Sequence, residues 1–282
     1  MAAELTSRAA LLASMWSYAA TVLRPAQALR RAWPGSAAEP IGDLPSHMPQ
    51  PGLGPHFSRL HGAPVLLDTV TAHDHLVEEF DRMAEVYDAY VQPFSRPIFE
   101  EALTWMRAHC LTSAARVLDA GCGPGRELRQ VARLVPRGEV VGIDLAAGMV
   151  RSAYRATRAQ GLDNTAFFQA DIGDLPAAFD GKFDLVYSSL AHHHYPDPPA
   201  AAKAILRCLR PGGVYCVVDP GPAWFVALSA PIARWADPGW VRFHTPAEFQ
   251  ELFHSVGFAR TAWVDLLPGF GAAIAQKPAG NG

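Results

Sequence analysis

Short hydrophobic runs alternate with segments of helical periodicity from about residue 112 to the end of the chain. Strands that alternate with helices predict a parallel sheet with helices on both faces. The turn dipeptide Pro268-Gly269 joins the last two runs as a hairpin, so we expect an antiparallel last strand. The predicted α/β fold has seven strands: Arg116–Ala120, Glu139–Asp144, Ala166–Ala170, Phe183–Ser188, Val214–Asp219, Arg260–Leu267 and Gly271–Gln276.

Helix signals fill the intervals between these strands. Gly212-Gly213 is the predicted stop of the helix before the fifth strand. Thr245 and Glu248 have the spacing of a capping box and begin a further helix. Upstream of the first strand, helical periodicity covers His75–Tyr90 and Pro97–His109, so two helices should precede the sheet.

The first 64 residues differ in composition from the rest. Residues 5–24 space their apolar side chains as an amphipathic helix does, whereas the prolines and glycines of 33–64 exclude sustained helix or strand. This helix either packs on its own domain or covers the substrate or contacts a membrane surface, and its apolar run is too short for a transmembrane segment. We expect an N-terminal helix over 1–32, a Pro-rich linker or arm over 33–64, and one domain over 65–282 with an apolar lid or substrate insertion at 220–244.

Composition narrows the classes of partner. Half of the residues are hydrophobic and 18% are charged, which is typical of a globular protein. The formal net charge of -3 provides no basic surface that would bind nucleic acid by counterion release. The four cysteines show neither CxxC spacing nor the density of a disulfide scaffold. We therefore expect reduced cysteines and a cytoplasmic protein.

A glycine-rich loop gives the densest chemical signal: Val117-Leu118-Asp119-Ala120-Gly121-Cys122-Gly123-Pro124-Gly125 runs from the first strand into a helix. Glycines there let the backbone approach a ligand closely, although a plain βα turn is the alternative. A dinucleotide fingerprint fits poorly, because Arg126 stands where its third glycine belongs. Roughly 20 residues after the loop, Asp144 ends the second strand, where a carboxylate either accepts from ribose hydroxyls or caps the next helix.

These motifs, in this order, resemble the class I S-adenosylmethionine-dependent methyltransferases. The matching pieces are D-x-G-x-G-x-G at Asp119–Gly125, the acid Asp144, and Gln169-Ala170-Asp171-Ile172. The Phe80–Asp88 segment and the Leu190–His194 stretch are similar to a small-molecule subgroup that includes the ubiquinone and menaquinone biosynthesis C-methyltransferases. The resemblance covers roughly residues 75 to 278.

The resemblance implies a Rossmann-like fold with S-adenosylmethionine as cofactor. It implies that Asp119 and the backbone of Gly121 and Gly123 hold the amino acid part, while Asp144 takes the ribose hydroxyls. Asp171 would accept from the adenine amine. The implied cofactor-contacting residues are Tyr87, Asp119, Gly121, Cys122, Gly123, Asp144, Leu145, Met149, Asp171, Ile172 and Ser188.

Three histidines follow the fourth strand, at the edge where open α/β sheets present their ligand crevice. A methyl transfer needs mainly alignment and exclusion of water, and it needs a base only if the acceptor still carries its proton. We predict His193 as that base, with His194 as second candidate and His192 in contact with the acceptor; the alternative is that they cap or pack beneath the next helix. No metal is expected, because neighbours on an extended chain point to opposite sides and no carboxylate cluster accompanies them.

Large apolar side chains crowd residues 220–244. Such side chains line small-molecule pockets or form a local helical core. We expect Trp224 or Phe225 to contact the acceptor together with Tyr90 and Phe94.

The predicted function is methyl transfer to a small, largely apolar acceptor, aromatic or prenylated. The alternatives are a catalytically silent cofactor-binding or scaffold subunit and a nicotinamide-dependent oxidoreductase. The methylated element and the oligomeric state stay open.

Overall fold

A computed structural model describes residues 87–237 and 239–280, with side chains described for 95–235, 237 and 239–280. The predicted N-terminal helix and Pro-rich arm lie outside these residues, so the predicted division of the chain stays a prediction. The described elements are α3 (Tyr87–His109), β1 (Arg116–Ala120), α4 (Arg126–Leu134), β2 (Glu139–Asp144), α5 (Ala147–Arg158), β3 (Thr165–Gln169), η3 (Ala177–Phe179), β4 (Phe183–Ser189), η4 (His192–His194), α6 (Pro198–Cys208), β5 (Leu209–Pro220), α7 (Ala223–Ala236), α8 (Pro246–Val256), β6 (Arg260–Leu267) and β7 (Phe270–Gln276).

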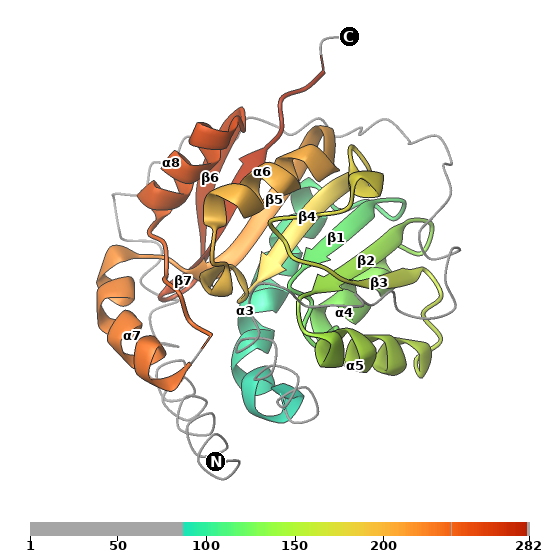
Figure 1. Ribbon diagram of the computed structural model, residues 1–282, viewed down its shortest axis with the longest axis horizontal. Helices are drawn as coiled ribbons and strands as arrows, with labels where there is room; N and C mark the ends of the chain where they lie inside the picture. The colour runs from blue at the N-terminus through green and yellow to red at the C-terminus, as the bar shows by residue number, and fades with distance from the viewer. Residues whose placement is uncertain (1–86, 238, 281–282) are drawn as a thin grey trace.

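Seven strands form one sheet in the order β3-β2-β1-β4-β5-β7-β6 (Figure 1). Strands β1 to β5 pair in parallel, whereas β7 is antiparallel to both β5 and β6. The hairpin turn at Pro268-Gly269 is what inserts β7 between β5 and β6. The predicted Rossmann-like α/β fold, with its mostly parallel sheet and antiparallel last strand, is therefore confirmed.

Helices cover both faces of this sheet (Figure 1). One face buries Met106 of α3, Leu128 of α4 and Val150 of α5. The opposite face buries Ile205 of α6 and Phe253 of α8. Strand β1 lies between the two layers with all of its residues buried, including the charged residues Arg116 and Asp119.

The structure corrects the predicted break between two helices before the sheet. α3 is one helix from Tyr87 to His109, and it continues through Pro97. Ile98 and Phe99 follow this proline and are buried against the sheet. Burial of this face outweighs the donor that proline removes from the helix. In the described part of the chain, no helix combines the length and the apolarity that a membrane crossing requires.

The boundary between α6 and β5 also differs from the prediction. α6 ends at Cys208, and β5 begins at Leu209, so Gly212-Gly213 lie within the strand and do not stop the helix. Leu209 pairs with Phe183 of β4, and a register shift follows before regular pairing resumes. Pairing with a neighbouring strand therefore sets this boundary, and local sequence does not reveal it.

The parallel strands present their carboxyl ends at one edge of the sheet. The strand order reverses between β1, which continues to β2 and β3, and β4, which continues to β5. Open α/β sheets bind ligands in the crevice outside the strand ends at such a reversal. The loops that follow β1 and β2 therefore stand opposite the loops that follow β4 and β5.

We predict that Phe253→Ala lowers the free energy of unfolding by about 3–5 kcal/mol, because a buried aromatic side chain is lost and a cavity remains. Phe253 is fully buried in α8 and packs against Tyr215 and Phe258. Urea unfolding followed by circular dichroism measures the change. Gln250→Ala, on the exposed side of α8, is the matched control and should change stability by less than about 0.5 kcal/mol. Equal small effects of both substitutions would contradict this core assignment.

Candidate active site

The loop between β1 and α4 places glycine backbone, which carries no side chains, at the point where the strand order reverses. Gly121 and Gly123 have φ angles of +82° and +50°, which side-chain-bearing residues rarely adopt. A Cβ on Gly121 would lie 2.7 Å from the Cβ of Ala191, whereas a Cβ on Gly123 would meet nothing within 4 Å among the described residues. Gly121 therefore allows the β1 loop to pack on the loop after β4. Gly123 leaves room for a ligand beside the backbone.

Asp144, at the end of β2, holds the glycine loop in position. Its Oδ2 accepts a hydrogen bond from the backbone N–H of Gly123 at 2.8 Å. Its Oδ1 accepts from the backbone N–H of Ala146 at 3.0 Å, at the start of α5. α5 has no side-chain hydrogen bond that caps it at Ala146, so the second bond is a local turn contact and not the helix-capping alternative that the sequence left open. A carboxylate has about four lone-pair sites, so a contact with ribose hydroxyls is compatible with both bonds.

Asp119 is a buried carboxylate at the end of β1, and its Oδ2 accepts a hydrogen bond from the Tyr187 hydroxyl at 2.7 Å. Burial raises the pKa of Asp119 well above its usual range; the bond from Tyr187 opposes this rise, and the charges of Glu127 and Asp144 add to it. A cationic ligand would favour the ionised carboxylate. The ammonium group in the amino acid part of S-adenosylmethionine fits this requirement. Tyr187 was not predicted, because it lies 68 positions from Asp119.

The remaining predicted cofactor residues follow the same edge of the sheet. Asp171 comes just after β3, and its Oδ1 accepts from the backbone N–H of Gly173 at 2.8 Å. Ile172 is partly buried and packs against the core. Asp171 thus stands at the end of the strand next to β2, the strand that carries Asp144. Of the others, Cys122 and Met149 are buried, Leu145 is half-buried, and the side chain of Tyr87 lies outside the described part.

Ser188 belongs to a buried hydrogen-bond chain that joins β4 to β1. The Tyr195 hydroxyl donates to the carbonyl of Ala120 at 2.9 Å and lies 3.0 Å from the Ser188 hydroxyl. A phenol carries one proton, so Ser188 must be the donor to Tyr195. The predicted cofactor residue Ser188 therefore braces the wall between the two loops. Tyr195 is a further site residue that the sequence analysis missed.

The three histidines after β4 form the short 3-10 helix η4 and not an extended segment. His192 is buried among the rings of Tyr195, His244 and Phe249, with centroids 4.9 to 5.1 Å away. Burial lowers the pKa of His192 well below its ordinary value, and the neighbouring histidines add to the effect. His192 thus has the packing role that the sequence left as the alternative. Its contact with the acceptor stays a prediction.

His193 forms a hydrogen bond with a carboxylate at the end of the next strand. Its Nδ1 lies 2.7 Å from Oδ1 of Asp219, whose side chain is fully buried in β5. Burial by itself lowers the pKa of His193, but the charge and hydrogen bond of Asp219, with a contribution from Asp237, outweigh it and raise the pKa. An ionised Asp219 accepts from Nδ1–H, so the lone pair of neutral His193 is on Nε2. With its lone pair on Nε2 and a carboxylate bonded at Nδ1, His193 is suited to accept a proton.

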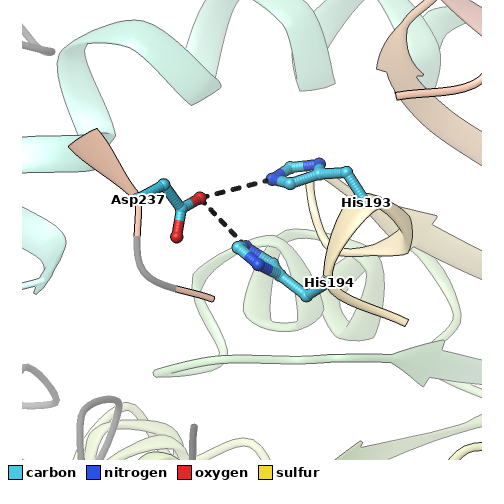
Figure 2. A group of neighbouring side chains, drawn as sticks. All are labelled: His193, His194 and Asp237. Atoms are coloured by element: carbon cyan, nitrogen blue, oxygen red, sulfur yellow. Dashed lines mark ion pairs between the residues drawn. The ribbon is translucent and has the colours of Figure 1, made fainter. Parts of the chain in front are cut away.

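The side chains of His194 and Asp237 lie close to that of His193 and form a second cluster of titratable groups with it. Nε2 of His194 lies 3.7 Å from Oδ2 of Asp237, and Nε2 of His193 lies 3.9 Å from the same oxygen (Figure 2). Burial lowers the pKa of His194, although the charge of Asp237 opposes the shift. The sequence argument against a metal assumed an extended chain and no carboxylate. Both assumptions fail, because η4 turns the two rings to one side and Asp237 arrives from the end of α7.

Comparison with known families decides what kind of domain this edge belongs to. Residues 111–250 match the family described as "Methyltransferase domain". The chain carries a methyltransferase domain. The match includes the glycine loop, Asp144 and η4, and it confirms the resemblance to class I enzymes, whose cofactor is S-adenosylmethionine.

Individual relatives of the methyltransferase domain agree with this class. Nocamycin O-methyltransferase of Saccharothrix syringae is 38% identical over 144 residues, which cover 51% of this chain and 50% of that protein. Ubiquinone biosynthesis O-methyltransferase of Psychrobacter arcticus is 34% identical over 162 residues, which cover 54% of this chain and 62% of that protein. The chain thus matches only about half to two thirds of the length of these relatives.

A solved structure supports the fold of the methyltransferase domain. The [4+2]-cyclase SpnF has a TM-score of 0.61 at 20% identity, and the alignment covers 78% of this chain and 100% of that chain. At this level of identity the likeness shows a shared fold. Since fold by itself does not determine the reaction, the reaction has to be argued from the site.

Residues 220–244, which we predict as a lid or substrate insertion, form helix α7 and a return segment that bonds to η4. The backbone N–H groups of Val241 and Arg242 donate to the carbonyl of His193 at 2.8 and 3.3 Å. Trp224 is exposed, whereas Phe225 is buried, belongs to the core, and packs against Phe270 with centroids 5.2 Å apart. Phe225 therefore has the core role that the sequence left as the alternative.

Two other predicted acceptor residues lie on the amino-terminal part of α3. Tyr90 and Phe94 belong to this helix, but their side chains lie outside the described part of the chain. The contacts predicted for Tyr90, Phe94, Trp224 and Phe225 with an acceptor therefore stay predictions.

We predict that Asp144→Ala weakens S-adenosylmethionine binding by about 1–3 kcal/mol, or about 5- to 150-fold, because a charged acceptor of hydrogen bonds is lost. The change also removes the bond that holds Gly123. Calorimetric titration with S-adenosylmethionine and with its demethylated product measures both affinities. Asp163→Ala removes a carboxylate that is 91% exposed and is the control. Unchanged affinity in Asp144→Ala would remove the ribose assignment.

Proposed function

We propose that this chain transfers the methyl group of S-adenosylmethionine to a hydroxyl oxygen of a small, largely apolar acceptor, and that His193 takes the hydroxyl proton. The observation that carries this proposal is the 2.7 Å bond between His193 and the buried Asp219. The pair stands at the ends of β4 and β5, across the strand reversal from the glycine loop. In this proposal the base stands on one side of the strand reversal and the cofactor residues stand on the other.

Asp119, the glycine loop, Asp144 and Asp171 hold the cofactor in this proposal. Asp119 faces the ammonium group, and the backbone at Gly123 lies against the amino acid part. Asp144 accepts from the ribose hydroxyls, while Asp171 accepts from the adenine amine. The support is that these groups occupy the ends of three adjacent strands, in the order in which the cofactor would extend across them.

When bound, S-adenosylmethionine supplies a sulfonium methyl that is already activated. The protein aligns the acceptor oxygen with that methyl and excludes water, and such positioning can supply about 7–11 kcal/mol. Nε2 of His193 removes the hydroxyl proton as the O–C bond forms and the C–S bond breaks. Asp219 stabilises the resulting imidazolium and keeps Nε2 directed toward the acceptor. The products are the methyl ether, the neutral thioether and a proton on His193.

The acceptor class is proposed from the exposed side of α7. α7 presents Trp224, Leu228 and Trp235, each more than half exposed, and such side chains suit an aromatic or prenylated molecule. Two relatives carry names that refer to small-molecule O-methylation. The net charge of -3 disfavours a nucleic acid as acceptor.

The four described cysteines are free and buried, in keeping with the proposed cytoplasmic location.

We predict that His193→Ala lowers kcat by about 10²- to 10⁴-fold, the range of general-base catalysis, with unchanged affinity for S-adenosylmethionine. Asp219→Asn should also lower kcat, because an amide can favour the wrong tautomer of His193. The assay is mass spectrometry of products from methyl-labelled cofactor and a panel of hydroxylated aromatic and prenylated compounds. His254→Ala, an exposed histidine on α8, is the control.

Three outcomes would count against the proposal. Wild-type turnover in His193→Ala would remove the base. Label found on carbon or nitrogen in every product would overturn the assignment to a hydroxyl oxygen. Cofactor binding without transfer to any compound in the panel or in an extract of the source cells would favour a silent cofactor-binding subunit.

A further inference from the structure

We propose that Nε2 of His193, Nε2 of His194 and the carboxylate of Asp237 form a binding site for a divalent transition-metal ion of the zinc class. Figure 2 shows both imidazole rings directed from one turn of η4 toward the Asp237 carboxylate. The three donor atoms lie within 4.8 Å of one another. Side chains from two distant parts of the sequence therefore converge on one point.

The spacing of the donors is close to that of a bound ion. Nε2 of His193 and Nε2 of His194 lie 3.9 and 3.7 Å from Oδ2 of Asp237. Zinc binds such atoms at about 2.0–2.2 Å, which places neighbouring donors on one ion about 3.3 Å apart in tetrahedral geometry. A small inward movement of the three side chains would close this gap. The side chains are 10%, 13% and 26% exposed, so an ion can enter from solvent.

Hydrogen bonds already orient two of the three donors, His193 and Asp237, as a metal needs. His194 instead bonds to the backbone of Gly239, and a metal at its Nε2 would replace that bond. Asp219 bonds to Nδ1 of His193 at 2.7 Å and leaves Nε2 as the ligating nitrogen. A carboxylate that orients a ligating imidazole in this way is the usual outer support of protein zinc sites. For Asp237, the backbone N–H of Gly239 donates to Oδ1 at 3.0 Å. The other oxygen, Oδ2, is the one that faces the two histidines.

Backbone bonds keep the two halves of the site together. The N–H of Asp237 donates to the carbonyl of Ala233 at 2.8 Å, which fixes it at the end of α7. Shortly after it, Val241 and Arg242 donate to the carbonyl of His193. The segment that carries Asp237 is therefore tied to the turn that carries both histidines.

The donor set selects the class of ion. Two imidazole nitrogens and one carboxylate suit zinc, cobalt or nickel, whereas magnesium and calcium prefer oxygen ligands throughout. Three protein ligands leave a fourth position open to water or to another molecule. The site thus differs from a closed structural zinc site.

A consequence for activity rests on the proposed function. The ion would occupy the Nε2 lone pair of His193 that the proposed base uses for the acceptor proton. Metal binding and proton removal at this nitrogen exclude one another. Bound zinc should therefore inhibit methyl transfer reversibly, and the metal-free protein should be the active form.

The binding test is a titration of chelator-treated protein with Co²⁺, followed by the visible absorption of the ion. We expect one Co²⁺ per chain, and an affinity at least about 100-fold lower in His194→Ala and in Asp237→Asn, since each loses a direct ligand. His254→Ala is the control that removes a histidine elsewhere and should bind as the unchanged protein does. Absence of a one-to-one complex, equal binding by all variants, or a thiolate spectrum from a cysteine would overturn the site.

The activity test separates this inference from the proposed function. Zn²⁺ should inhibit label transfer by the unchanged protein, and a chelator should restore it. Loss of transfer on chelation, or no inhibition at a Zn²⁺ concentration that fills the site, would overturn the inhibitory role. Wild-type turnover in metal-free His193→Ala would instead remove the proposed base and leave the Co²⁺ result unaffected, so the two failures are distinguishable.

Discussion

Buried and half-buried carboxylates at the edge of an apolar sheet are the constraint on which the rest of this structure depends. A charge removed from water is costly unless hydrogen bonds or an opposite charge compensate it. Each carboxylate here has its own compensation: Tyr187 bonds to Asp119, two backbone N–H groups bond to Asp144, and His193 bonds to Asp219. The compensating groups fix the loops that carry them. Polar contacts consequently organise this edge of the sheet, while the two apolar layers hold the strands in place.

The two sides of the crevice use these carboxylates differently. On the β1 and β2 side, Asp144 organises backbone, and the glycines bring that backbone close to a ligand. On the β4 and β5 side, Asp219 bonds to Nδ1 of His193, and the proposed function uses the other imidazole nitrogen. The contact of Gly121 with Ala191 and the bond from Tyr195 to Ala120 join the sides. A donor held on one side can therefore be aligned with an acceptor on the other.

The sequence predicted whatever depends on local pattern. The strands, the glycine loop and the position of Asp144 at a strand end follow from hydrophobic runs and short motifs, and the fold was confirmed. The partners of the site residues were not predictable in this way: Tyr187 lies 68 positions from Asp119, and Asp219 lies 26 positions from His193. Local pattern also failed where packing decides the outcome, as in the unbroken α3 and in the turn of η4 that brings the rings of His193 and His194 to one side.

The contact between η4 and the return segment that follows α7 has a consequence for how the protein can vary. It consists of the main-chain N–H groups of Val241 and Arg242 and the main-chain carbonyl of His193, so most amino acids at these positions would preserve it. Residues such as Trp224 and Leu228 can then be exchanged without displacing the imidazole. In the proposed function, substitutions on α7 can change the acceptor preference while the geometry at His193 stays the same.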